Sequence, residues 1–179
     1  MSSHESDERL MANVATGNRE ALEILIRRYA GSLLTFIHRL IGDRHRSEEL
    51  FQEVFFSVWD KRSQYQFPRA FKSWLFAIAL NRCRVEFRKK STPMSSATSE
   101  AITEDPEPVD IMIATETAEQ VSQALTRLPP QQRTVVMLRI WQELSYAEIA
   151  EMLDKSEGTI RSHMHHALAT LRKHLGSHT

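Results

Sequence analysis

The sequence predicts an all-α protein of two small helical domains joined by a flexible acidic linker. Apolar residues recur at spacings of three and four throughout, whereas the alternation typical of strands is absent. The formal charge also changes along the chain, from +5 over residues 1–90 to −7 over 91–123 and +2 over 124–179. The acidic part, "STPMSSATSEAITEDPEPVD", has little to bury. We therefore predict domains at 1–90 and 113–179, with the linker at 91–112.

The apolar spacing predicts eight helices, at 7–16, 19–41, 46–61, 69–89, 113–127, 130–140, 146–153 and 157–175. In the first domain, Gly17-Asn18, Gly42-Asp43 and the segment "SQYQFP" break the pattern. In the second domain, Ser145 and Glu148 form a capping-box pattern at the start of a short helix. Ser156 is the expected N-cap of the last helix.

Only Asp154-Lys155-Ser156 separates the last two predicted helices, which is the spacing of a helix-turn-helix. The second helix of such a motif enters the major groove of DNA by its amino-terminal end. Helical hairpins also occur in proteins that bind no DNA, so the pattern alone leaves DNA binding open. The expected core positions of the two helices are Ile149, Ala150 and Leu153 in the first, and Ile160, Met164, Ala167, Leu168, Leu171 and Leu175 in the second.

Composition and motifs exclude several classes of function. The single cysteine, Cys83, rules out an intrachain disulfide and a cysteine-based zinc cage. The amino terminus lacks a secretory signal pattern, and the apolar run "WLFAIAL" is too short to span a bilayer. No phosphate-cradling glycine loop, metal-ligand cluster or nucleophile motif is present. We therefore expect a cytoplasmic protein that is not an enzyme and needs no cofactor.

Two long segments resemble bacterial RNA polymerase sigma factors. "ALTRLPPQQRTVVMLRIWQELSYAEIAEMLDKSEGTIRSHMHHALATLRKHL" resembles sigma region 4 in its "LP..QR.V..L", "LSY.EIA" and "S.GTI.S" motifs. Upstream, "GDRHRSEELFQEVFFSVWDKRSQYQFPRAFKSWLFAIALNRCRVEFRKK" resembles region 2 in its "EELFQEVF" and "WL..IA.N....R" motifs. The two regions in this order, without other sigma domains, are typical of the extracytoplasmic-function group.

The resemblance implies a subunit that binds core RNA polymerase, recognises the −35 and −10 promoter elements and promotes strand opening. The implied contacts on the polymerase are the clamp helices of the largest subunit and the flap of the β subunit, with promoter DNA as the other partner and no insertion into membranes. In the family the linker threads through polymerase channels, although a solubilising spacer explains the acidic composition equally well. Whether an anti-sigma factor sequesters the chain stays open.

The helix predicted at 46–61 carries more apolar surface than one contact needs. Leu50, Val54 and Val58 form one stripe, whereas Phe51, Phe55 and Trp59 form a second. A second stripe indicates a partner, unless the helix is buried on both sides within its own domain. The neighbouring carboxylates are either solvated or the polar part of the same interface. By resemblance, the residues expected to bind core polymerase are Glu49, Leu50, Phe51, Gln52, Val54 and Phe55.

The helix predicted at 69–89 combines expected core residues (Phe71, Leu75, Ile78 and Val85) with a second stripe of an aromatic, an alanine, an amide and two cations: Trp74, Ala77, Asn81, Arg84 and Arg88. Such a face suits single strands whose bases stack and whose phosphates are neutralised. A core tryptophan and a solvated cationic end would give the same pattern. By resemblance, this helix and the loop "KRSQYQFP" recognise the −10 element through Lys61, Arg62, Trp74, Asn81, Arg82, Arg84 and Arg88.

Four of the eight histidines lie between Gly158 and Leu175. His163 and His166 have the spacing of a metal-binding pair, but no carboxylate or thiol lies beside them to complete a site, so we expect no metal. By resemblance, they stand where the family usually carries arginine, and Asp154 stands where glycine is common. The residues expected to bind the −35 element are Ser156, Glu157, Thr159, Arg161, Ser162, His163, His165 and His166.

Three functions are compatible with these patterns. The first is the promoter-specificity subunit that the resemblance implies. The second is a stand-alone helix-turn-helix regulator, in which residues 1–90 form a sensor or dimerisation bundle. The third is a helical adaptor that binds only protein. Copurification with core polymerase, followed by run-off transcription, separates the three.

Overall fold

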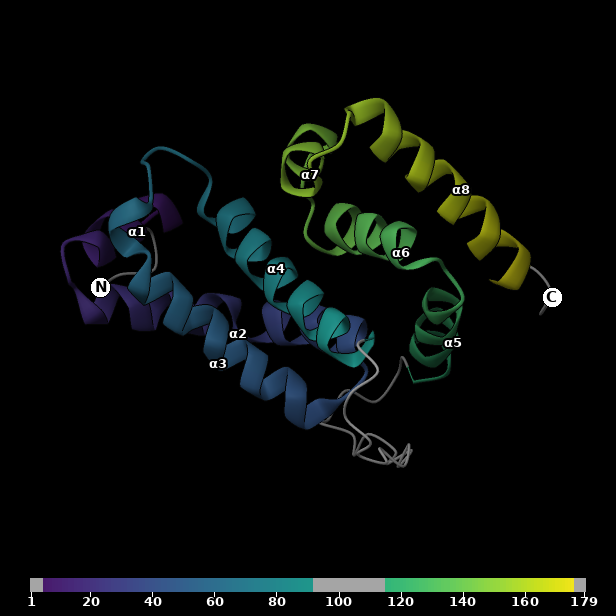
Figure 1. The fold of residues 1–179 in the computed structure, drawn as a ribbon, viewed down its shortest axis with the longest axis horizontal. Coiled ribbons are helices and arrows are strands. Elements are labelled where there is room, and N and C mark those ends of the chain that lie inside the picture. Colours follow the sequence, from purple (N-terminus) through teal and green to yellow (C-terminus); the bar gives the residue numbers. More distant parts are fainter. Residues whose placement is uncertain (1–4, 92–114, 176–179) are drawn as a thin grey trace.

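The computed structural model describes residues 5–91 and 115–175, and every element in these ranges is helical (Figure 1). The predicted all-α fold is therefore confirmed. Apart from Ser91, the predicted linker lies outside the described residues. The α-helices are α1 (Asp7–Ala15), α2 (Arg19–Ile41), α3 (Arg44–Asp60), α4 (Phe71–Ser91), α5 (Thr115–Thr126), α6 (Pro130–Val136), α7 (Tyr146–Leu153) and α8 (Glu157–Leu175), with two short helical turns, η1 (Arg62–Gln64) and η2 (Met137–Trp141).

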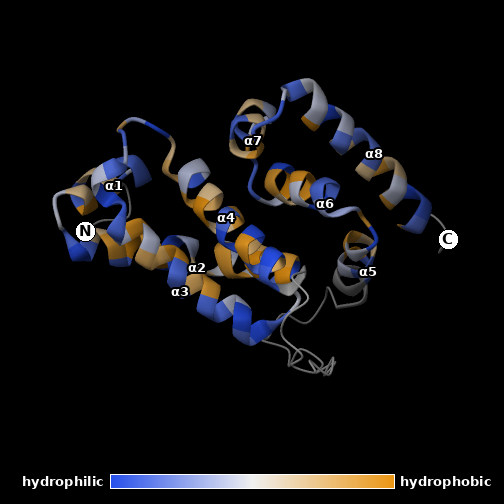
Figure 2. Ribbon diagram, in the orientation of Figure 1, coloured by the Kyte–Doolittle hydropathy of each residue, from blue (hydrophilic) through white to orange (hydrophobic). Residues whose placement is uncertain are grey.

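The amino-terminal helices pack around α4, which contacts α1, α2 and α3. This helix is apolar on more than one side (Figure 2), because its buried residues include neighbours in sequence such as Leu75 and Phe76 as well as Cys83. Val85, expected in the core, is instead 42% exposed, and Cys83 is buried in its place. The expectation for Val85 was therefore wrong.

Local capping explains where these helices begin and end. The side-chain oxygens of Asn18 and Asp43 accept hydrogen bonds from backbone N–H groups in the first turns of α2 and α3. Gly42 closes α2 in the left-handed conformation, at φ 76°. Each of these residues lies at a predicted break, so the helix limits are encoded locally.

In the carboxy-terminal domain, α8 packs against α5, α6 and α7. Between α6 and α7 the chain forms a π-helical turn, η2, which the apolar spacing did not predict. The predicted core of the last two helices is largely confirmed, with Ile149, Ile160 and Met164 buried. Leu175 differs from the prediction, since it is 40% exposed at the end of α8.

The two domains touch each other. Helix α7 lies against α4 (Figure 1), and Glu151 of α7 forms an ion pair with Arg69, at 3.0 Å. On η2, the Trp141 ring lies 4.7 Å from the guanidinium carbon of Arg39 on α2. Within the described part of the chain, none of the helices combines the length and the apolar character that crossing a bilayer requires.

Candidate nucleic-acid interface

The helix-turn-helix is built by two side-chain caps and one left-handed residue. The Ser145 hydroxyl accepts a hydrogen bond from the Glu148 N–H at 3.2 Å, and the Glu148 carboxylate accepts one from the Ser145 N–H at 2.8 Å. This is the predicted capping box. Asp154 then turns the chain at φ 52°, and the Ser156 hydroxyl accepts from the Thr159 N–H at 3.1 Å to start α8. The amino-terminal end of α8 is thereby presented to solvent.

Arg161 is held in place on the outer face of α8. Its guanidinium carbon lies 4.5 Å from the centre of the Tyr146 ring, and a guanidinium nitrogen lies 3.5 Å from the Glu157 carboxylate. Arg139 approaches the same ring, at 5.1 Å. A cation that is already oriented loses less conformational freedom when it binds a phosphate or a base edge.

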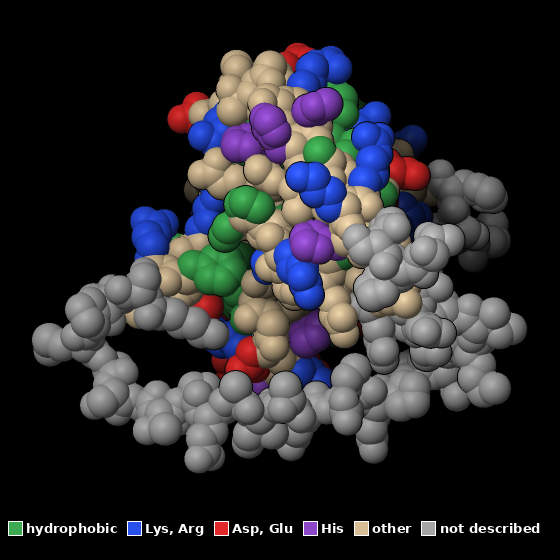
Figure 3. All heavy atoms as spheres, turned by 90° about the vertical axis from the view of Figure 1, so that its right-hand side faces the viewer, with side chains coloured by type: hydrophobic (Ala, Val, Ile, Leu, Met, Phe, Trp, Pro, Cys, Tyr) green, Lys and Arg blue, Asp and Glu red, His purple; other side chains and the backbone are tan. Residues whose placement is uncertain are grey.

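His165 lies one helical turn beyond Arg161 on this face, whereas His163 and His166 lie on other sides of α8. His165 and His166 are exposed with their rings 5.7 Å apart, and His163 is half-buried. Histidine side chains are interspersed with lysine and arginine side chains on the face of the molecule that includes α8, together with some apolar and acidic ones (Figure 3). Among the residues that the structure describes, no group of three or more His, Cys, Asp or Glu side chains could hold a metal ion. The surface suits an anionic partner.

Helix α3 is buried more deeply than its second apolar stripe suggested. Leu50, Val54 and Phe55 are at most 6% exposed, and the half-buried Phe51 and Trp59 pack against the same core. The stripe taken as a sign of a partner is therefore largely internal, as in the alternative of a helix buried on both sides. Direct contact with polymerase by these three buried side chains would require the core to open.

The apolar side chain that α3 does expose is Phe56, at 73%. Sequence reasoning missed it, because Phe56 belongs to neither stripe. A signal was available, since Phe56 lies one helical turn beyond Gln52 and two beyond Glu49, both predicted to contact polymerase and both exposed. Glu49, Gln52 and Phe56 thus form one exposed face of α3.

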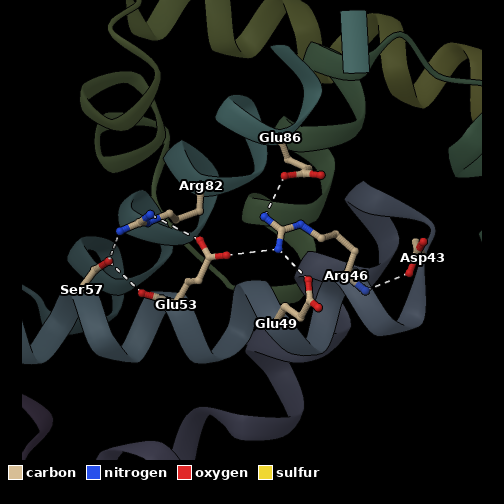
Figure 4. Close-up of polar contacts among 7 residues, drawn as sticks. All are labelled: Asp43, Arg46, Glu49, Glu53, Ser57, Arg82 and Glu86. Carbon is tan, nitrogen blue, oxygen red and sulfur yellow. Dashed lines mark hydrogen bonds and ion pairs between the residues drawn. The ribbon is translucent and has the colours of Figure 1, made fainter. Parts of the chain in front are cut away.

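A polar network on the adjoining side of α3, which includes Glu49, joins this helix to α4 (Figure 4). Arg46 is its centre: its guanidinium donates to Glu49 at 2.7 Å and to Glu86 at 2.8 Å, and lies 3.2 Å from Glu53. The hydrogen bonds to Glu86 and Glu49 raise the pKa of Arg46. The acidic residues of α3 are therefore partly engaged within the domain.

Arg82, expected at the −10 element, belongs to the same network. Its guanidinium donates to the Ser57 hydroxyl at 2.7 Å and lies 3.4 Å from the Glu53 carboxylate (Figure 4). Arg82 therefore braces α3 against α4. It can contact DNA only with its remaining donors or by releasing these partners.

The aromatic residues before and within α4 pack on one another. Trp74 is half-buried, edge-on to Tyr65 at 5.3 Å and tilted against Phe71 at 6.3 Å. Arg62 stacks on Trp59 at 4.3 Å and donates to its carbonyl at 2.7 Å. These contacts fix the loop that leads into α4.

Further side chains that can meet DNA lie along the rest of α4 and at both ends of the loop before it. Lys61 and Asn81 are exposed, as is Arg88, and Arg84 is half-buried. Phe67, which sequence reasoning also missed, projects from the loop with 63% exposure. Cations, an amide and an aromatic ring are thus available around α4, as a single strand would require.

Comparison with known proteins decides between the three functions. The sigma-70 region 2 family matches residues 25–92 and the sigma-70 region 4 family matches residues 118–171. The ECF RNA polymerase sigma factor SigM of Mycobacterium tuberculosis strain H37Rv is 35% identical over 176 residues, covering 96% of this chain and 85% of that protein. The chain belongs to the extracytoplasmic-function sigma factors.

Further similarities agree with this family. The ECF RNA polymerase sigma factor SigW of Bacillus subtilis strain 168 is 27% identical, covering 90% of this chain and 92% of that protein. In fold, the chain is similar to the sigma factor RpoE of Bartonella quintana, which was solved with the anti-sigma factor NepR. The TM-score is 0.73 and the identity is 21%, and the match covers 88% of this chain and 98% of that chain. As a sigma factor, this chain is a promoter-specificity subunit of RNA polymerase. Of the three functions considered, the promoter-specificity subunit therefore holds, and the stand-alone regulator and the adaptor do not.

Proposed function

We propose that three surfaces of this sigma factor divide its work. The exposed face of α3 binds core polymerase, α4 with its preceding loop binds the −10 element, and the first half of α8 binds the −35 element. In this scheme residues 1–90 and 113–179 are the two working domains and 91–112 is the linker between them. The chain acts in the cytoplasm by binding alone, without catalysis of its own.

The proposed polymerase contact consists of Glu49, Phe51, Gln52 and the newly found Phe56. The exposure of Phe56 next to two polar side chains supports it, because interfaces commonly combine an aromatic anchor with a polar rim. The buried Leu50, Val54 and Phe55 pack α3 onto the core. They affect polymerase binding only by holding α3 in position. Because the Bartonella quintana relative was solved with an anti-sigma factor, we include such a factor among the partners to be tested.

The proposed −10 contact consists of Trp74, Asn81, Arg84 and Arg88 on α4, with Lys61, Arg62 and Phe67 from the loop region. Asn81 is an amide that can read a base edge, whereas the cations neutralise phosphates. Phe67 offers a ring on which an unstacked base can lie. Arg82 contributes mainly by holding α4 on α3.

The proposed −35 contact consists of Arg161 with its neighbours Ser156, Glu157, Thr159, Ser162, His163, His165 and His166. The oriented guanidinium of Arg161 is the observation that carries this assignment. Thr159 and Ser156 share a hydrogen bond at 2.9 Å, so these two hydroxyls act together at the start of α8.

The test uses reconstituted holoenzyme and compares two arginines of α8. Arg161→Ala should weaken binding to promoter DNA about tenfold, whereas Arg172→Ala, an exposed arginine near the other end of the helix, should leave it nearly unchanged. Filter binding or fluorescence anisotropy measures both variants after copurification confirms that each binds core polymerase. Equal losses in the two variants would show that α8 contributes only general positive charge.

A further inference from the structure

The contact between the two domains places acidic side chains on the helix proposed for the −10 element. On α7, Glu148 and Glu151 are three residues apart and therefore lie on the same side of the helix. The Ser73 hydroxyl of α4 donates to the Glu148 carboxylate at 2.5 Å. The Arg69 guanidinium, just before α4, donates to the Glu151 carboxylate at 3.0 Å. Two donors of the first domain thus hold two carboxylates of the second.

The residues proposed to bind DNA lie along one stripe of α4, formed by Trp74, Ala77, Asn81, Arg84 and Arg88. The contact with α7 covers the amino-terminal half of this stripe. Ala70, Ser73 and Ala77 line a small pocket on the α4 side, and Glu148, Glu151 and Met152 close it from the α7 side. Ala77 lies on the stripe itself, and Ser73 lies beside Trp74. A DNA strand that follows the stripe and α7 in its present place would occupy the same space.

The chemistry of the contact resembles that of a phosphate contact. Carboxylates and phosphates are both anionic acceptors, and both are bound by guanidinium and hydroxyl donors. Burial alone would raise the pKa of Glu148, but the hydrogen bonds from Ser73 and Ser145 and the charge of Lys72 together hold that pKa below its ordinary value. Glu148 therefore carries its negative charge against α4 at neutral pH.

A second contact fixes the orientation of the two domains. Arg39 of α2 stacks on Trp141, at 4.7 Å, beside a pocket lined by Ser32 and Thr35 of α2 and by Met137 and Gln142. This contact involves other helices than the pair α4 and α7. Two separate contacts between the same domains define one closed arrangement rather than a single-point attachment.

The closed arrangement is incompatible with binding both promoter elements at once. Elements centred at −35 and −10 are about 25 base pairs apart, which at about 3.4 Å per base pair is roughly 85 Å along the duplex. Domains that touch through α4 and α7 cannot lie on both. Opening must therefore precede or accompany promoter recognition.

We propose that the free chain inhibits itself in this closed arrangement, with Glu148 and Glu151 occupying the places of DNA phosphates on α4. The −10 strand and helix α7 then compete for one surface, and the domains must separate before the strand binds. The inference rests on the proposed assignment of α4 to the −10 element. It adds a partner for that surface, namely helix α7 of the same chain.

The test compares the full chain with a double variant, Glu148→Gln with Glu151→Gln. Glutamine at position 148 keeps the capping box of α7, so the helix should persist. Glu20→Gln with Glu23→Gln is the matched control, since it also removes two negative charges, and both residues are exposed carboxylates of α2. Circular dichroism verifies the fold of each variant.

Two readouts follow the opening of the domains and the binding of DNA. Burial raises the pKa of the Cys83 thiol to about 12, so fluorophores can be attached to cysteines introduced at the exposed Thr16 and Gln131 for energy transfer. Unlabelled protein is titrated with a short fluorescein-labelled single strand of mixed sequence, without core polymerase. The double variant should show lower energy transfer and bind the strand roughly tenfold more tightly, while the control matches the parent chain.

A charge exchange tests the ion pair directly. Arg69→Glu and Glu151→Arg should each lower energy transfer, and together they should restore it. Unchanged energy transfer in the glutamine double variant overturns the closed contact, and lower energy transfer with unchanged strand affinity overturns the inhibition.

Adding Arg84→Ala to the double variant separates this inference from the proposed function. Weaker strand binding supports both. Unchanged strand binding refutes the assignment of α4, and with it the competition, even where energy transfer shows that the contact exists.

Discussion

Phe56 and Phe67 are the most exposed large apolar side chains of the described residues, and they lie on different proposed surfaces. Phe56→Ser should lower copurification with core polymerase at least tenfold, because it removes the aromatic anchor of the α3 face. Phe67→Ser should leave copurification unchanged and slow open-complex formation, measured by permanganate reactivity. Each variant is the control for the other. If both variants lose the same activity, the two surfaces are not separate.

The histidines of α8 give a prediction about charge. Arginine is always charged and presents a planar set of donors to phosphate. Replacing His163 and His166 with arginine should therefore strengthen binding of the holoenzyme to promoter DNA and make that binding more sensitive to salt. Unchanged affinity in the double variant would contradict the proposed role, as would loss of parent binding on adding a chelator.

At single positions, the sequence shows the chemical character of a side chain but not which side chains it contacts in the fold. The charge of Arg82 and the aromatic ring of Trp74 are read directly, but the partners of Arg82 come from α3, more than twenty residues away. Likewise, Leu50 and Phe55 match the family motif without being accessible. Which of several apolar faces becomes buried depends on helices distant in sequence, and local periodicity carries no information about them.

The pairing of α3 with α4 gives a prediction at the scale of elements. Arg46→Gln should lower the free energy of unfolding by about 1–2 kcal/mol, because three neighbouring carboxylates lose the cation between them. Arg44→Gln, which removes an exposed arginine paired with Glu48, should cost less than about 0.5 kcal/mol. Urea denaturation of both variants checks the difference. Equal costs would mean that the network adds nothing beyond surface charge.

The turn of the helix-turn-helix gives a second prediction at this scale. Asp154 adopts φ 52°, a conformation that glycine enters without a steric penalty. Asp154→Gly should therefore stabilise the domain by about 0.5 kcal/mol in urea denaturation. Lys155→Gly, at the next position, should destabilise it by about 0.5–1 kcal/mol, because glycine there only adds freedom to the unfolded chain. A destabilised Asp154→Gly variant would show that the aspartate side chain contributes more than its backbone strain costs.

Apart from the end of α6, the helix limits were predictable to within two residues, because most of their signals are local. Asn18, Gly42 and Ser145 act at the ends where the sequence placed them. The π-helical turn at Met137–Trp141 was not predictable, since apolar spacing does not distinguish it from the end of an α-helix. The contact of α7 with α4 was not predictable either, because the capping box alone accounts for a glutamate at position 148.

At the scale of the whole molecule, the two domains are compatible with two states. In the closed state α7 covers part of α4, and in the promoter-bound state the domains lie on separate DNA elements. The same chain can therefore keep its DNA surfaces unavailable when free and expose them on polymerase. In the closed state, Glu148 and Glu151 of α7 lie against the basic first domain through Ser73 and Arg69.

This chain directs core polymerase to promoters through paired −35 and −10 contacts. The direct measurement is run-off transcription by core polymerase with and without the chain, on a library of fragments carrying randomised upstream sequence, with sequencing of the transcript ends. We predict that start sites appear only when the chain is present, at a fixed distance downstream of one shared pair of elements. Starts that do not depend on the chain, or that share no paired elements, would contradict promoter selection through these two contacts.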